Sequence, residues 1–275
     1  MSQTGTTSGT TLPVPASLPP ADQAALEGAV AVLEGISIPV RLASMAGSTV
    51  EALKRTLPAP VREGLDAAVE RALAVALRTA LASGPGGTRP ARLPQPWLHR
   101  GLMAASGMAG GAFGMAGTLV ELPVSTTLLL RQIAAIAAAE GEDLSDPAVQ
   151  AECLKVFALG GRDPRDDGAE SGYFALRIAL AEAVGIAAGR GVAALLPGFL
   201  SAVAARFGVP VAVKLSAQAA PLVGAATGAA VNLAFLEHFR GVGEAHFTIR
   251  RLERRHGPVL VRRAYDALRD ERMAE

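Results

Sequence analysis

Apolar residues recur at three- and four-residue intervals along several stretches of the chain, which is the spacing of one face of a helix. The clearest repeat follows Pro58 and Pro60 and consists of Val61, Leu65, Val69, Leu73, Leu77 and Leu81. Helices are also predicted over residues 22–33, 149–159, 173–188 and 259–273. No stretch shows the alternation of side chains that is typical of strands. The pattern therefore predicts an all-α protein, a multi-helix bundle with no β-sheet.

Changes in composition divide the chain into four parts. Residues 1–20 lack the basic and apolar regions of a secretory signal, and we expect a disordered N-terminal tail. Residues 21–83 are expected to form N-terminal helices, including a short one that begins at a capping box at residues 48–51. The Gly- and Pro-rich residues 84–96 are expected to be a linker, and residues 97–275 a helical core.

Glycine and alanine are abundant in the expected core. Aromatic residues make up 4% of the chain, which also has 30 Gly and a mean hydropathy of +0.33, so we expect a core of Ala, Leu, Val and Gly. Residues 101–120, 191–205 and 215–236 carry the fewest charges and are candidates for membrane contact. Glycines three or four residues apart are Gly107 and Gly111; Gly110, Gly114 and Gly117; Gly185 and Gly189; and Gly224 and Gly228. This GxxxG spacing predicts close helix packing, either in an interfacial or partly inserted helical hairpin or in a wholly soluble Ala/Gly core.

Charged residues nearly balance over the whole chain, with a net charge of +1, so no overall field favours nucleic acid. Only three of the 26 basic residues are Lys, a bias that indicates a high-GC bacterial genome. Between residues 240 and 263, seven Arg accompany two Glu. This excess predicts a basic patch for an anionic membrane surface, with a solvated face of ion pairs as the alternative. Its members are Arg250, Arg251, Arg254, Arg255, Arg262 and Arg263.

Four segments taken in order, residues 111–161, 170–177, 206–239 and 246–257, resemble the EcsC family. The resemblance implies a helical bacterial protein whose biochemical activity is not established. It also implies a link to transport, because the family is named after a protein encoded beside the ATPase and permease of an ABC transporter. The polar features that match the family are Glu121 with Pro123, Arg131, the turn at 141–143, Arg177, Lys214, Asn232, His238, His246 and the run 250–253. Gln132, Arg240 and His256 depart from the family pattern, which would weaken any chemistry that depended on them.

No catalytic motif accompanies these residues. The chain has neither a GxSxG nor an SxxK sequence, and its four histidines do not have the spacing of a zinc peptidase. The acidic residues at 163–167 lack the ligand spacing of a calcium loop. The single Cys153 rules out an intramolecular disulfide and is expected to be a buried, inert thiol. We therefore expect no metal and no cofactor, and we favour a non-enzymatic role.

Two charges stand out because they lie in an apolar stretch, where an unpaired charge costs several kcal/mol. Glu121 and Arg131 are therefore expected to meet partners such as Arg177 or Lys214. One interpretation is a structural ion pair. The other is a polar pocket for a small anionic or lipid-like ligand, with Glu121, Arg131, Arg177, Lys214, Asn232, His238 and His246 as candidates. A pocket around Glu121, Arg131 and His238 would suit a hydrolase, a peptidase or a ligand-binding domain.

The leading functional prediction is a membrane-associated accessory protein in transport or envelope processes. We expect it in the cytoplasm, peripheral to or partly inserted at the inner face of the cell membrane. The expected partner is membrane lipid or a membrane protein such as an ABC transporter component, and no nucleic acid is expected. The reaction, if there is one, and the oligomeric state do not follow from the sequence.

Overall fold

The computed structural model describes residues 17–35, 57–81, 96–160, 172–185, 196–217 and 224–274, together with Ala52 and Arg55. Within these ranges the chain forms nine helices and no strand, which confirms the all-α prediction. The helices are α1 (Pro20–Leu33), α4 (Ala59–Leu81), α5 (Pro96–Ala112), α6 (Gly114–Ala139), α7 (Pro147–Leu159), α8 (Tyr173–Gly185), α9 (Leu196–Ala217), α10 (Gly224–His256) and α11 (Pro258–Ala274). The expected tail up to residue 16, the capping box at 48–51, the linker at 84–95, residues 163–167 and Gly189 lie outside the described residues.

Local chemistry sets several helix ends. Asp146 precedes α7, and its Oδ1 accepts a hydrogen bond from the Ala148 N–H at 2.8 Å, while Pro147 occupies the first helical position. Gly257 has a φ of +86° and ends α10. Gly114 has a φ of +63° and separates α5 from α6. Because side chains disfavour these backbone angles, the two glycines fix where the chain changes direction.

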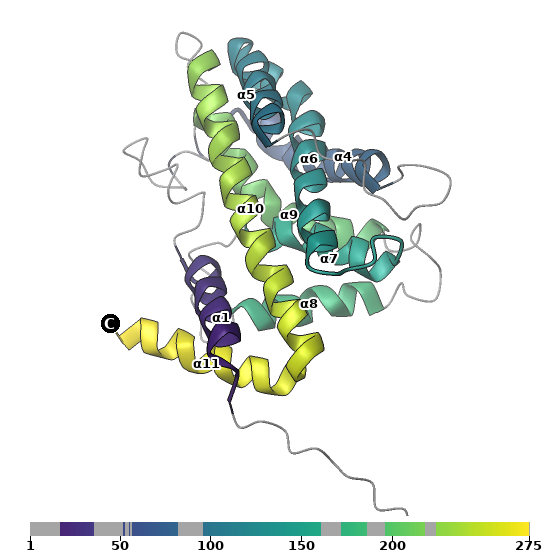
Figure 1. Ribbon diagram of the computed structural model, residues 1–275. Helices are drawn as coiled ribbons and strands as arrows, with labels where there is room; N and C mark the ends of the chain where they lie inside the picture. Colours follow the sequence, from purple (N-terminus) through teal and green to yellow (C-terminus); the bar gives the residue numbers. More distant parts are fainter. Residues whose placement is uncertain are drawn as a thin grey trace, which may run out of the picture.

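The longest helix, α10, has 33 residues and runs along the bundle for about 50 Å (Figure 1). α5 packs against its first half, α6 packs along it as far as Gly243, and α1 and α11 lie at its other end. α4 packs on α6 and α9, and α9 also contacts α7 and α8. The helices on the N-terminal side of the expected linker therefore share one hydrophobic core with the later helices.

The centre of this core is more aromatic than we expected. Phe157, Phe207 and Phe239 are buried, and their ring centroids lie 4.7 to 5.5 Å apart. The expected core of Ala, Leu, Val and Gly is therefore incomplete. The few large rings of the chain gather at one point because they fill volume that small side chains would leave empty.

The sequence suggests one continuous apolar segment at 101–120, but the structure divides it between two helices. The chain turns at Phe113 and Gly114, and α5 and α6 fold back on each other as a helical hairpin. Two described helices are long and apolar enough to cross a membrane, α6 and the part of α9 at Gly198–Ser216, but half or more of each segment is buried in the protein. Helices of this kind are also common in the cores of soluble proteins.

Candidate functional site

α5 and α10 approach each other very closely at Gly107 and Gly228. A Cβ atom built on Gly107 would lie 2.2 Å from the Gly228 carbonyl oxygen, and one built on Gly228 would lie 2.0 Å from the Gly107 oxygen. Gly110 and Gly117 are similarly close across the α5–α6 turn, since a Cβ on Gly117 would be 2.4 Å from the Gly110 oxygen. The glycines therefore allow backbones to touch, as their spacing predicts, although Gly114 itself lies at the turn.

A buried ion pair lies beside this contact. The Glu121 carboxylate of α6 and the Lys214 ammonium of α9 are 2.7 Å apart, and the two residues are 7% and 1% exposed. The expected partner of Glu121 is thus confirmed as Lys214. Buried charges of opposite sign stabilise one another strongly because little water screens them.

Three further side chains contact this pair: Ser106, Ser125 and Asn232. We call these five residues, including Glu121 and Lys214, the ion-pair cluster. Asn232 Nδ2 donates to Glu121 Oε1 at 2.8 Å and to the Met103 carbonyl at 3.0 Å. Ser106 also donates to Glu121, and Ser125 Oγ lies 3.4 Å from Lys214 Nζ. Burial alone would raise the pKa of Glu121, but the Lys214 charge and these hydrogen bonds hold it below its ordinary value. The carboxylate is therefore ionised at neutral pH.

A second polar network joins α7, α8 and α10 around His246. The ring is fully buried, with Nδ1 2.8 Å from the Tyr173 hydroxyl and Nε2 3.0 Å from Glu152 Oε2. Because a carboxylate only accepts, Nε2 carries the proton and Nδ1 accepts from Tyr173. Burial also lowers the pKa of His246, so the ring is neutral at pH 7. Arg177 pairs with both oxygens of Glu253 at 2.8 and 3.0 Å nearby.

The Glu152 carboxylate makes the free energy of unfolding depend on pH in the acidic range. Burial would raise its pKa, but the hydrogen bond from His246 and the charges of Lys155 and Arg250 lower it strongly. A lowered pKa in the folded state contributes stability above the unfolded-state value of about 4.3, and this contribution is lost as the pH falls below that value. We expect Glu152→Gln to lower the free energy of unfolding at pH 7 and to flatten its decline between about pH 5 and 3. Urea denaturation followed by circular dichroism at several pH values measures both effects.

A control for this prediction is available on the partner helix. Glu244 is exposed on α10, and its one ion pair with a described residue is with Arg240, at 3.6 Å. Glu244→Gln should leave the acid dependence close to that of the parent protein. An equal flattening in both variants would contradict a specific role of Glu152.

The predicted basic patch is largely neutralised by carboxylates from other elements. Arg250 binds Glu142 at 2.7 and 3.2 Å, Arg251 binds Glu140 at 2.6 Å, and Arg254 also contacts Glu142. Arg255 lies 3.4 Å from Asp22, and Arg262 lies 3.9 Å from Asp266, whereas Arg263 is exposed. These carboxylates lie on α1, at the α6–α7 turn and on α11. The patch therefore carries less free charge than the local sequence indicates.

The remaining candidates lie apart from the ion-pair cluster. His238 Nε2 is 2.9 Å from the Gly160 carbonyl. Arg131 lies near His99, and burial together with the Arg131 charge lowers the pKa of His99. In the described part of the chain, the buried Nε of Arg131 and both ring nitrogens of His99 have no hydrogen-bond partner. Glu121, Arg131 and His238 share no hydrogen bond or ion pair in that part of the chain.

Metal ligands and the cysteine thiol were also candidates for chemistry. Among the described residues, no group of three His, Cys, Asp or Glu side chains could hold a metal ion. Cys153 is fully buried, and burial raises the pKa of its thiol, as expected for an inert cysteine. The residues that sequence reasoning missed are Ser106, Ser125, Glu152 and Tyr173. No local motif marks them, because the partners that join them to other helices lie 15 to 94 residues away.

The outer side of the α5–α6 hairpin is apolar. We define the apolar hairpin surface as the exposed large hydrophobic side chains of this region, namely Trp97, Leu98, Leu102, Met108, Phe113, Val120 and Val124. Trp97 is 70% exposed, and Phe113 and Val120 are each 79% exposed. Between Arg100 and Arg131 the only charged residue is Glu121, which is buried. The hairpin therefore presents no charge to its surroundings along this stretch.

These features define a class of protein: an α-helical bundle with a buried ion pair behind an apolar helical hairpin. The model of the EcsC protein family matches residues 95–252, which include the hairpin and most of α10. The chain belongs to the EcsC family, as the sequence resemblance indicates. No curated protein and no solved structure matches the chain.

Proposed function

We propose that this EcsC-family protein is a non-enzymatic, membrane-associated accessory protein whose apolar hairpin surface enters one leaflet of the bilayer. The observation that carries the proposal is the concentration of exposed apolar side chains. Of the eleven large hydrophobic residues exposed in the described part of the chain, seven belong to this surface. A soluble protein rarely exposes so many apolar side chains together unless they contact lipid or a partner.

The charges at the base of the hairpin support insertion to a limited depth. Arg100 on α5 pairs with Glu237 on α10, and residues 224–236 of α10 carry no charge. Arg100 and Arg131 are about 20 and 27 Å along their helices from Phe113, less than the roughly 30 Å of a hydrocarbon core. Trp97 lies near Arg100, at a level where indole rings favour the headgroup region. Because one leaflet is only about half as deep as the hydrocarbon core, about 15 Å, this arrangement suits a hairpin that enters one leaflet obliquely and does not cross the bilayer.

The ion-pair cluster fits the same role. It joins α6, α9 and α10 behind the apolar hairpin surface while keeping its charges buried. We propose that it holds the hairpin rigid, and that the contacted membrane is the inner face of the cell membrane. The family resemblance adds a membrane protein, such as an ABC transporter component, as a candidate partner in transport or envelope processes. A hydrolase has less support, because the carboxylate of Glu121 is enclosed by its partners.

Vesicle flotation tests the proposal. The full chain is expected to float with vesicles of phosphatidylethanolamine and phosphatidylglycerol. Phe113→Glu with Val120→Glu should weaken binding by about tenfold or more, since each apolar side chain contributes roughly 1.5–3 kcal/mol when it leaves water. Both side chains are exposed, so the variant should keep the helix content and melting temperature of the parent protein.

A matched control tests whether the location of the charge matters. Val259 is 73% exposed at the start of α11, far along α10 from the hairpin. Val259→Glu should float like the parent protein. Failure of the parent protein to bind vesicles, or an equal loss in both variants, would refute insertion through the hairpin.

A further inference from the structure

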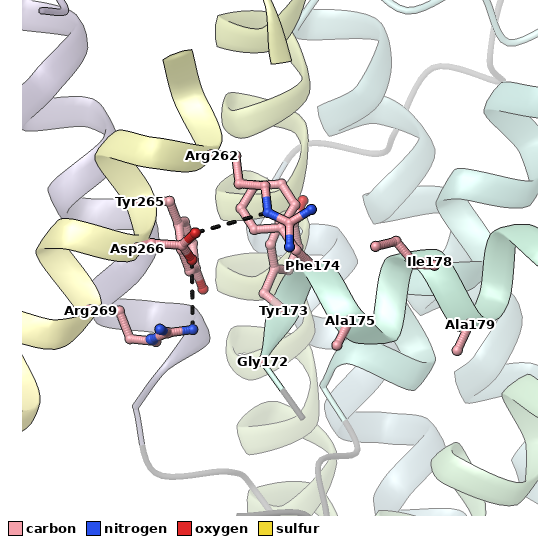
Figure 2. Close-up of a pocket in the computed structure, with 10 residues that line it drawn as sticks. All are labelled: Gly172, Tyr173, Phe174, Ala175, Ile178, Ala179, Arg262, Tyr265, Asp266 and Arg269. Atoms are coloured by element: carbon pink, nitrogen blue, oxygen red, sulfur yellow. Dashed lines mark ion pairs between the residues drawn. The ribbon is translucent and has the colours of Figure 1, made fainter. Parts of the chain in front are cut away.

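A pocket of about 440 Å³ lies between α8 and α11, on the side of α8 that faces α11. Figure 2 shows its charged side chains on α11 and its apolar side chains on α8. Its size is in the range of pockets that hold small molecules. Gly107 touches Gly228 near the start of α10, whereas α11 follows the end of α10 at His256, about 42 Å further along. The pocket is therefore remote from the apolar hairpin surface and faces a different environment.

The wall of this pocket is formed by rings that the protein holds in place. Tyr173 and Tyr265 are buried and stacked, with ring centroids 5.5 Å apart and an interplanar angle of 25°. The Tyr173 hydroxyl is bonded to His246, and the Tyr265 hydroxyl donates to Glu34 Oε1 at 2.5 Å. Phe174 packs edge-on against both rings. A wall fixed in this way is preformed for a ligand, which lowers the entropic cost of binding.

The described lining of the pocket contains two arginines and one carboxylate. Arg262 and Arg269 both line it, and Asp266 lies between them as the single carboxylate among the described lining residues. Arg269 is held at 2.9 Å by Asp270 and at 3.6 Å by Asp266. Arg262 is exposed, reaches Asp266 only at 3.9 Å and has its Cζ 5.5 Å from the centroid of the Phe174 ring, so its N–H groups can still bind another anion. Guanidinium groups bind phosphate and carboxylate through paired hydrogen bonds.

The α8 side of the pocket is apolar and open. Ala175, Ile178 and Ala179 line it, and Ile178 is among the exposed large hydrophobic residues. A free inorganic anion would contact the guanidinium groups but leave this side in water. A neutral apolar molecule would contact this side but make no use of the Arg262 guanidinium.

We infer that the pocket binds a small amphipathic anion, with its phosphate or carboxylate head at Arg262 and Arg269 and its apolar body along Ala175, Ile178 and Ala179. The head competes with Asp266 for the two guanidinium groups. Removing that carboxylate therefore strengthens binding, whereas removing Arg262 weakens it. These opposite effects distinguish a specific site from general attraction to a basic helix.

Isothermal titration calorimetry with octyl phosphate and octanoate tests this site in the full chain. Each is used below its micelle concentration, and the tighter of the two identifies the head group. Arg262→Ala is expected to weaken binding about tenfold, because a hydrogen bond to a charged group is lost. Asp266→Asn should tighten it severalfold. Ile178→Glu, which places a negative charge on the apolar side, should also weaken binding and provides a variant that leaves α11 unchanged.

Arg263 supplies the matched control, since it is the exposed neighbour of Arg262 on α11 and does not line the pocket. Arg263→Ala removes the same charge and should leave binding unchanged. Inorganic phosphate, which lacks the alkyl tail, and octyl glucoside, which lacks the charge, should each bind at least tenfold more weakly than the tighter of the two amphipathic anions. Equal binding of octyl glucoside, equal loss in the two arginine variants, or no binding of either anion would overturn the inference. None of these results bears on vesicle binding by the hairpin.

Discussion

Lys214→Met is expected to lower the free energy of unfolding by about 3–5 kcal/mol, the largest effect of any single substitution proposed for this protein. The change removes the ammonium that faces Glu121 at 2.7 Å in a region closed to water. Ser106 and Asn232 would still donate to the carboxylate, but no positive charge would compensate its burial. Urea denaturation followed by circular dichroism at pH 7 measures the loss.

A double-mutant cycle isolates the pair itself. Glu121→Gln combined with Lys214→Met removes both charges, and we expect part of the stability to return relative to Lys214→Met alone. Arg240→Met is the control, since Arg240 is exposed and its pairs with Glu237 and Glu244 should contribute no more than about 1 kcal/mol. A loss below 1 kcal/mol for Lys214→Met would show that the buried pair does not hold α6 and α9 together.

Gly107→Ala is expected to be the next most damaging change, with a net loss of about 2 kcal/mol. The new methyl group would lie 2.2 Å from the Gly228 carbonyl oxygen and 2.8 Å from Asn232 Cγ, so α5 and α10 would have to separate. Replacing a helical glycine by alanine otherwise gains about 1 kcal/mol, which offsets part of this cost. The shift of Asn232 would also disturb its bond to Glu121.

Helix α5 also offers a control substitution that should change stability in the opposite direction. Gly101 is exposed on α5, and a Cβ atom there meets nothing within 4 Å. Gly101→Ala should therefore raise the melting temperature slightly, whereas Gly107→Ala lowers it. Equal effects at the two positions would contradict the backbone contact between α5 and α10.

Helix positions were predictable to a large extent because they depend on local signals. The stripe from Val61 to Leu81 forms α4, and the Asp146–Pro147 start opens α7. The turn at Gly114 was missed, because a glycine in an Ala- and Gly-rich stretch is compatible with both a helix and a turn. Contacts with α10 and a φ of +63° decide between them.

The site was predictable only in part. Burial of Glu121 in an apolar stretch required a cationic partner, and Lys214 was one of the two proposed. The arginines after residue 249 appeared to be in excess, because their carboxylate partners Glu140, Glu142 and Asp22 are more than 100 residues away in the chain.

The sequence by itself determined the helical class, the family and the glycine spacing that permits backbones to touch, since these depend on residues close together in the chain. The tertiary structure alone decided which glycines meet, which charges neutralise one another and where apolar side chains remain exposed. The physical reason is that close packing and charge pairing act through space. Gly107 and Gly228, or Arg250 and Glu142, become neighbours only after the helices have packed.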